Sequence, residues 1–124
     1  MREEFSLNGT WEFVSDPDRS LTYDRLGAMQ PIRVPGPWQT QLPALRHYRG
    51  VAWYRLRFPV PPTWPGQRIR LHFEAVNYLC QAWLNGHFLG QHEGGYLPFC
   101  FDIDHLVKPG AEAVLVLRVL LTLV

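Results

Sequence analysis

The stretch from Trp83 to Ile103 limits the fold of this 124-residue chain more than any other. Residues 80–84, which overlap its start, alternate between apolar and other side chains, and this is the period-two pattern of a β-strand with two different faces. Asn85-Gly86 follows, and it is the strongest short signal for a β-hairpin because both central residues of a type I′ turn need positive φ. The stretch therefore predicts a strand, a tight turn and a returning strand.

A pair of glycines, Gly94-Gly95, follows the predicted hairpin. Glycine adopts backbone conformations that residues with a Cβ avoid, so we expect a corner at which at least one of the two has positive φ. Residues 99–103 then resume the alternation of a strand. We expect the corner to hold Tyr96 and Pro98 at the rim of the domain.

Strand-like alternation recurs at short spacing along the rest of the chain. Residues 52–58 and 69–75 each place apolar side chains on one face, and residues 113–120 are apolar on both faces, as in a strand buried on both sides. Residues 19–30 show no period and predict a loop. The predicted fold class is all-β, an antiparallel β-sandwich of about eight strands with almost no helix. Its predicted core comprises Tyr54, Leu56, Phe58, Ile69, Leu71, Phe73, Leu84, Phe99, Phe101 and Leu115.

The two cysteines are predicted to be free thiols. Cys80 falls in register with the apolar side of its strand, whereas Cys100 alternates away from Phe99 and Phe101. Two cysteines without closer spacing or a secretory context behave more often as small hydrophobic residues than as a disulfide.

Composition excludes several classes of partner. The net charge of +1 argues against nucleic acid, which needs a concentrated basic patch. No apolar run approaches the about 18 residues of a membrane-spanning helix. The start, Met1-Arg2-Glu3-Glu4, is unlike a signal peptide. We therefore expect no nucleic-acid partner, no membrane partner and a cytoplasmic location.

Four blocks of the chain, taken together and in order, carry a family resemblance. They are Leu7 to Phe13, Val34-Pro35-Gly36-Pro37-Trp38, Tyr48 to Phe58, and a motif of Asn85-Gly86, Gly90, His92, Gly94-Gly95-Tyr96, Pro98-Phe99 and Asp102-Ile103. In this order the blocks resemble the amino-terminal domain of glycoside hydrolase family 2, which includes β-galactosidases, β-glucuronidases and β-mannosidases. The resemblance spans nearly the whole chain and implies one jelly-roll β-sandwich of the galactose-binding-like type over residues 1–124.

The resemblance also implies a role without catalysis. In family 2 the acid and the nucleophile are glutamates of a (β/α)₈ barrel that lies later in the chain, and this sequence contains no such barrel. The domain there buttresses the barrel and lends loops to the active-site rim, so the implied partners are a carbohydrate and the missing barrel. Because the chain stops in the apolar run Leu120 to Val124, we expect it to be a piece or a shortened product of a longer glycosidase.

The acids of the chain suggest no catalytic site of their own. A retaining glycosidase needs two carboxyls about 5 to 5.5 Å apart. The pairs Asp16 with Asp18 and Asp102 with Asp104 are better explained as turn and capping groups. We assign no catalytic residue.

Metal-ligand spacing is equally weak. His87 and His92 could approach each other across the hairpin, but a third ligand is missing. Glu93, Asp102 and Asp104 could supply oxygens to calcium, but nothing in their spacing makes them converge. We expect no metal and no other cofactor.

Aromatic side chains are the candidates for contact with a sugar or with another domain. Sugars pack their apolar C–H faces on exposed rings while amides and guanidinium groups take their hydroxyls. A tryptophan on the polar face of a strand can equally pack under a loop or a neighbouring domain, and this structural explanation is the favoured one. The candidate contact residues are Trp38, Trp53, Trp83, His92 and Tyr96, and the structural motif is Asn85, Gly86, Gly94, Gly95 and Pro98.

Two other functions stay open from the sequence. A free-standing carbohydrate-binding module would bind a sugar saturably. An architectural domain for oligomer assembly would instead associate with itself as its concentration rises.

Overall fold

The computed structural model describes residues 4–36, 41–62, 69–73, 79–93 and 99–121. Within these residues all paired strands are antiparallel. The strands are β1 (Gly9–Ser15), β2 (Gln30–Val34), β3 (Gly50–Pro59), β4 (Arg70–Phe73), β5 (Leu79–Leu84), β6 (His87–Glu93), β7 (Phe99–Asp102) and β8 (Glu112–Leu121), and a 3₁₀ turn, η1, spans Pro43–Leu45. The all-β fold predicted from alternation is confirmed.

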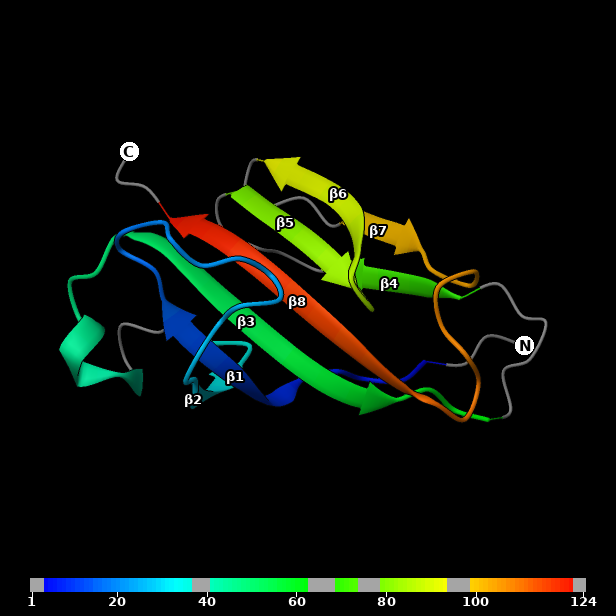
Figure 1. Ribbon diagram of the computed structural model, residues 1–124. Coiled ribbons are helices and arrows are strands. Elements are labelled where there is room, and N and C mark those ends of the chain that lie inside the picture. The colour runs from blue at the N-terminus through cyan, green and yellow to red at the C-terminus, as the bar shows by residue number, and fades with distance from the viewer. Residues whose placement is uncertain (1–3, 37–40, 63–68, 74–78, 94–98, 122–124) are drawn as a thin grey trace.

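The strands form two sheets that share one core. Six of them form a sheet in the order β2-β1-β3-β8-β5-β6, while β4 and β7 form the second sheet. The long strands β3 and β8 lie in the middle of the larger sheet, and the smaller sheet lies beside β5 and β6 (Figure 1). One apolar cluster joins Leu71 of the smaller sheet to Leu84 and Leu115 of the larger one. The architecture is the predicted antiparallel jelly-roll β-sandwich.

The predicted core residues divide by depth. Phe58, Ile69, Leu71, Leu84 and Leu115 are buried, whereas Tyr54, Leu56, Phe73, Phe99 and Phe101 are partly buried and pack against the same cluster. The larger sheet supplies further core side chains that the sequence-based set omitted, among them Trp11, Phe13 and Ile32. All ten predicted residues therefore contribute to one core.

The face of the larger sheet that points away from this core, which we call the outer face, is partly covered. Residues 16–29, which connect β1 to β2, cross it in front of β3 (Figure 1). Leu26 of this segment packs with Val51, Trp53 and Val116 in a second apolar cluster. Residues 19–30 are largely a loop, as predicted, and β8 is buried on both faces, because Leu115 faces the core and Val116 the outer cluster.

The Asn85-Gly86 turn has the predicted conformation. Asn85 has a φ of 50° and Gly86 a φ of 83°, and the turn joins β5 to β6 with Leu84 opposite His87. The Asn85 side chain adds two bonds, since its Nδ2 donates to the Leu106 carbonyl at 2.8 Å and its Oδ1 accepts from the Val114 amide at 2.9 Å. The turn is therefore tied to both β8 and the loop after β7.

Further predictions concern the cysteines and the glycine corner. Cys80 and Cys100 are both free, as predicted, with Cys80 buried and Cys100 exposed. Burial raises the pKa of the Cys80 thiol to about 12. The corner predicted at Gly94-Gly95 lies outside the described residues. No helix among the described residues is long and apolar enough to cross a membrane.

Candidate functional site

The structure separates the predicted contact residues into two places. Trp53 and Trp83 lie together on the outer face, with their ring centroids 5.5 Å apart. His92 lies on β6 opposite the buried Cys80, and therefore on the core side of the sheet. Trp38, Tyr96 and the motif residues Gly94, Gly95 and Pro98 lie outside the described residues.

Trp53, one of the candidate contact residues, is buried rather than exposed to solvent. Alternation correctly placed it on the face opposite Tyr54, but the side chain is only 2% exposed because residues 16–29 cover it. Its indole Nε1 donates a 3.0 Å hydrogen bond to the Asp16 carboxylate. Trp53 therefore packs under a loop, which was the favoured explanation for a tryptophan out of phase.

Asp16 is the group that holds this loop down. Its carboxylate accepts bonds from the backbone amides of Ser20 at 2.9 Å and Leu21 at 3.2 Å, besides the one from Trp53. Burial alone would raise the pKa of Asp16, but these three bonds and the nearby charge of Arg118 outweigh it and lower the pKa. The residue is thus an ionised structural anchor.

Trp83 is the centre of an aromatic cluster that reaches solvent. Tyr23 stacks on it with ring centroids 5.6 Å apart and planes 14° apart. Phe88 contacts it at 5.3 Å from the neighbouring strand. Tyr23 is 36% exposed and Phe88 is 55% exposed, whereas Trp53 closes the cluster from below. Among the candidate tryptophans that the structure describes, Trp83 is therefore the one that can still contact a ligand or another domain.

Sequence reasoning missed Tyr23 and Phe88. Phe88 had a usable signal, because a two-residue turn at Asn85-Gly86 that places Leu84 opposite His87 also places Trp83 opposite Phe88. Tyr23 had none, since it belongs to a loop without periodicity whose path is set by tertiary contacts.

A row of polar side chains crosses the outer face beside the aromatic cluster. Arg118 Nη1 of β8 donates to Gln81 Oε1 of β5 at 3.2 Å. Gln81 Nε2 in turn donates to Gln91 Oε1 of β6, also at 3.2 Å. The three residues are direct cross-strand partners, so the row runs perpendicular to the strands.

His92 does not lie next to His87, although the sequence allowed the two to approach each other. It does not face His87 across the hairpin, because both belong to β6 and lie near opposite ends of that strand. Its ring stacks on Phe99 of β7 at 4.1 Å, which ties the edge of the larger sheet to the smaller one. Its Nε2 is buried and forms no hydrogen bond among the described residues. His92 therefore contributes to the packing between the two sheets.

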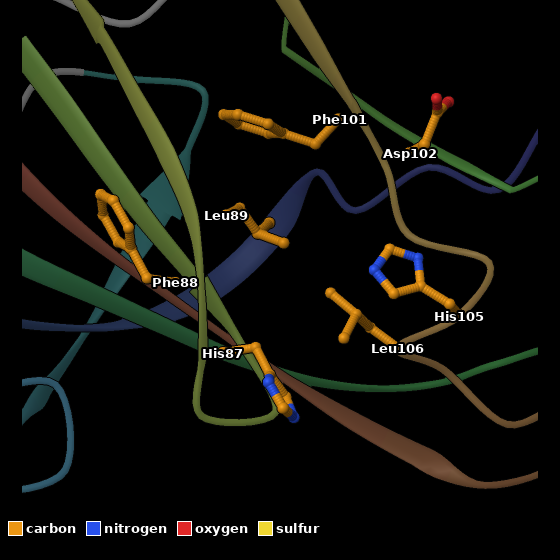
Figure 2. A pocket seen from close by; sticks show the side chains of 7 residues that line it. All are labelled: His87, Phe88, Leu89, Phe101, Asp102, His105 and Leu106. Atoms are coloured by element: carbon orange, nitrogen blue, oxygen red, sulfur yellow. The ribbon is translucent and has the colours of Figure 1, made fainter.

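An open groove of about 600 Å³ runs between β6 and the loop after β7. Figure 2 shows Leu89 and Phe101 on the side of β6 that faces this groove, whereas Phe88 points to the other side of the strand. The remaining lining includes His105 and Asp102, and the Asp102 carboxylate is paired with Arg70 at 3.2 Å. No three histidine, cysteine or acidic side chains of the described residues lie close enough to hold a metal ion.

The carboxyls with displaced pKa values are poor candidates for acid catalysis. The hydrogen bond from Arg55, at 2.8 to 2.9 Å, and the arginine's charge lower the pKa of Glu12. The pKa of Asp16 is lowered as well. A glycosidase acid needs a raised pKa so that it stays protonated near neutral pH. Both groups are therefore suited to structural ion pairs and hydrogen bonds.

Comparison with known proteins gives consistent matches. The family model described as glycosyl hydrolases family 2, sugar binding domain, matches residues 5–122. A β-glucuronidase of Paenibacillus borealis is 36% identical over 118 residues, which are 90% of this chain and 20% of that enzyme. A β-galactosidase of Thermoanaerobacter pseudethanolicus is 44% identical over 63 residues, which are 51% of this chain and 8% of that enzyme.

Solved structures match over nearly the whole chain. The crystal structure of Ruminococcus gnavus β-glucuronidase superimposes with a TM-score of 0.89 at 29% identity, covering 98% of this chain and 22% of that one. Faecalibacterium prausnitzii β-glucuronidase gives a TM-score of 0.83 at 36% identity, with 93% and 20% covered. The chain thus spans about a fifth of the length of these β-glucuronidases. It belongs to glycosyl hydrolases family 2, as the sugar binding domain of that family.

Proposed function

We propose that this chain works as the non-catalytic amino-terminal domain of a glycoside hydrolase that cleaves O-glycosyl bonds. In this role it buttresses the catalytic barrel and contributes to the sugar-binding rim, while the barrel supplies the acid and the nucleophile. The observation that carries the proposal is the extent of the match, since nearly all of this chain corresponds to about a fifth of a β-glucuronidase. The number of β-glucuronidases among the relatives favours a uronic acid in the substrate of the whole enzyme.

A domain exchange tests this role directly. Residues 5–122 would replace the matching segment of the Paenibacillus borealis β-glucuronidase, and hydrolysis of nitrophenyl glucuronide would be compared with that of the same enzyme lacking the segment. We expect the exchanged enzyme to be soluble and clearly more active than the deletion.

The control is the same exchanged enzyme carrying Phe13→Ala. Phe13 is fully buried in the core, so truncating it should cost about 3 to 5 kcal/mol and remove the benefit of the domain. An exchanged enzyme whose inserted domain is folded, yet which is no more active than the deletion, contradicts the proposed role.

A second candidate function is carbohydrate binding by this chain itself. The observation in its favour is the outer face, where the solvent-exposed rings around Trp83 lie beside a row of amide and guanidinium groups.

A further inference from the structure

The outer face carries an aromatic and amide patch, defined by Tyr23, Gln81, Trp83, Phe88, Gln91 and Arg118. Its strand residues come from β8, β5 and β6, while Tyr23 comes from the loop between β1 and β2. The patch lies on the side of the sheet opposite the shared core, and it meets the groove between β6 and the loop after β7 at Phe88, which lines both.

The aromatic part of the patch is fixed in place. Trp83 lies between Tyr23, Phe88 and Trp53, all within 5.3 to 5.6 Å of its ring centroid. Trp53 cannot move easily because it is buried and bonded to Asp16. Rigid rings lose little conformational freedom on binding, and they offer flat apolar surfaces to the C–H face of a pyranose.

The polar part of the patch supplies both hydrogen-bond donors and hydrogen-bond acceptors. Gln81 and Gln91 carry amide donors and acceptors, and Gln91 is exposed to solvent. Of the five N–H donors of Arg118, one is used in a bond to another described residue. Among the described residues no carboxylate lies within ion-pair distance of this guanidinium. Among the described residues Arg118 therefore has donors left over, and its guanidinium, which lies 6.0 Å from the ring centroid of Trp53, is suited to a carboxylate on a ligand.

The length of the patch suits a short oligosaccharide. Phe88 and Arg118 are two strands apart, and their register positions differ by two residues. With strands about 4.8 Å apart and residues about 3.4 Å apart, the two positions are separated by roughly 12 Å. A ligand that reaches from the ring to the guanidinium must therefore have more than one sugar unit.

The same surface is a poor match for a protein partner. The most exposed rings of the patch are Phe88 and Tyr23, whereas Trp83 is partly buried, and amide groups border them. A stable protein interface buries about 800 Å² on each side around an apolar centre. Two rings beside a polar row resemble the mixed lining of a ligand site more closely.

We propose that the aromatic and amide patch binds an acidic oligosaccharide, with Phe88 and Tyr23 contacting an apolar pyranose face, Gln81 and Gln91 taking hydroxyls, and Arg118 taking a carboxylate. The inference rests on the proposed function for its ligand class, but it places the ligand on a surface of this chain alone. Failure of binding leaves the domain exchange unaffected, so the two proposals can be separated.

The test is a titration of the full chain, followed by NMR and by tryptophan fluorescence. The acidic probe is xylotetraose carrying a glucuronic acid branch, and unsubstituted xylotetraose is its neutral control. We expect saturable changes at Trp83 and Phe88 with the acidic probe, weaker ones with the neutral probe, and a preference that shrinks with added salt because the Arg118 contact is screened.

Variants assign the contacts. Phe88→Ala should weaken binding of both probes by about tenfold or more, as for an aromatic residue at the centre of a contact. Arg118→Gln should remove the preference for the acidic probe, so that both probes bind equally well. Phe5→Ala, at an aromatic residue that is 46% exposed and outside the patch, should bind like the original chain.

Two results overturn the proposal. One is the absence of any saturable change with either probe up to about 10 mM, which is weaker than any specific contact of this size should be. The other is a concentration-dependent self-association that Phe88→Ala abolishes while leaving sugar binding unchanged, which would make the patch a protein interface. Melting temperatures of the variants, measured alongside, show that each change acts on a folded chain.

Discussion

At the scale of single residues, Asp16 supports both the loop after β1 and the aromatic rings of the outer face. Its carboxylate accepts hydrogen bonds from the backbone amides of Ser20 and Leu21 in the loop, and from the indole of Trp53, which lies 37 residues further along the chain. Trp53 in turn supports Trp83, and Trp83 supports the exposed rings of the patch. The rigidity of the outer face therefore depends on one buried charge.

We expect Asp16→Ala to lower the free energy of unfolding by about 2 to 3 kcal/mol, because a buried indole N–H and two loop amides lose a charged acceptor. Urea unfolding followed by tryptophan fluorescence measures this. Asp18→Ala, an exposed residue of the same loop, is the control and should change stability by less than about 0.5 kcal/mol. Equal effects of the two substitutions would show that the loop is not anchored through Asp16.

The lowered pKa of Asp16 predicts a pH dependence with a definite sign. A carboxyl whose pKa is lower in the folded chain contributes stability above its unfolded pKa, about 3.9, and loses it as the pH falls further toward the folded value. The stability difference between the original chain and Asp16→Asn should therefore be constant from pH 7 to about pH 5 and shrink below about pH 4. Urea unfolding at several pH values measures it, and a difference that grows toward acid contradicts the sign.

At the scale of elements, Gly90 is a point at which the β5–β6 hairpin comes close to the second sheet. A register irregularity interrupts the pairing between Ala82 and Trp83, and Gly90, opposite Ala82, has a φ of 143°. A Cβ placed there would lie 3.1 Å from Cε1 of Phe101 on β7. The absence of a side chain at Gly90 lets the two sheets approach each other at this point.

We therefore expect Gly90→Ala to destabilise the chain by about 1 to 3 kcal/mol, from backbone strain together with the contact to Phe101. Gly9→Ala is a matched control, because Gly9 has a similar φ of 141° but no atom of the described residues within 4 Å of the added methyl group. Thermal unfolding of the two variants separates strain from packing. If Gly9→Ala costs as much as Gly90→Ala, the close approach of Phe101 does not matter.

At the scale of the whole molecule, the chain is expected to be inactive by itself. Isolated, it should leave the nitrophenyl galactoside, glucuronide and mannoside intact, because the carboxyls with displaced pKa values are held ionised rather than protonated. A complete β-glucuronidase assayed in parallel confirms that the glucuronide substrate is competent. Turnover that survives repurification and disappears when one carboxylate is replaced would show that the chain has its own active site.

The sequence pattern predicted those features of the fold that depend on residues close together in the chain. The alternation of residues 52–58 gave the faces of β3, and Asn85-Gly86 gave a turn whose φ values are both positive. Burial of Trp53 could not be predicted in this way, because a loop without periodicity covers it. The patch was half predictable, since Trp83 and Phe88 follow from the turn, whereas Arg118 depends on the order of strands in the sheet and Tyr23 on the path of a loop without periodicity. The single-domain assignment to residues 1–124 and the cytoplasmic location stay predictions.

The pairing of β3 with β8 has a consequence for the time at which the protein can fold. The residues that pair in these two strands are between about 50 and 70 positions apart in the chain. At synthesis rates of about 5 to 20 residues per second, β3 leaves the ribosome several seconds before its central partner exists. During that interval its apolar residues Val51, Leu56 and Phe58 lack the strand that later covers one edge. Pairing of the two central strands of the larger sheet can therefore begin only once β8 has left the ribosome, whereas β1, β2 and β3 can pair earlier.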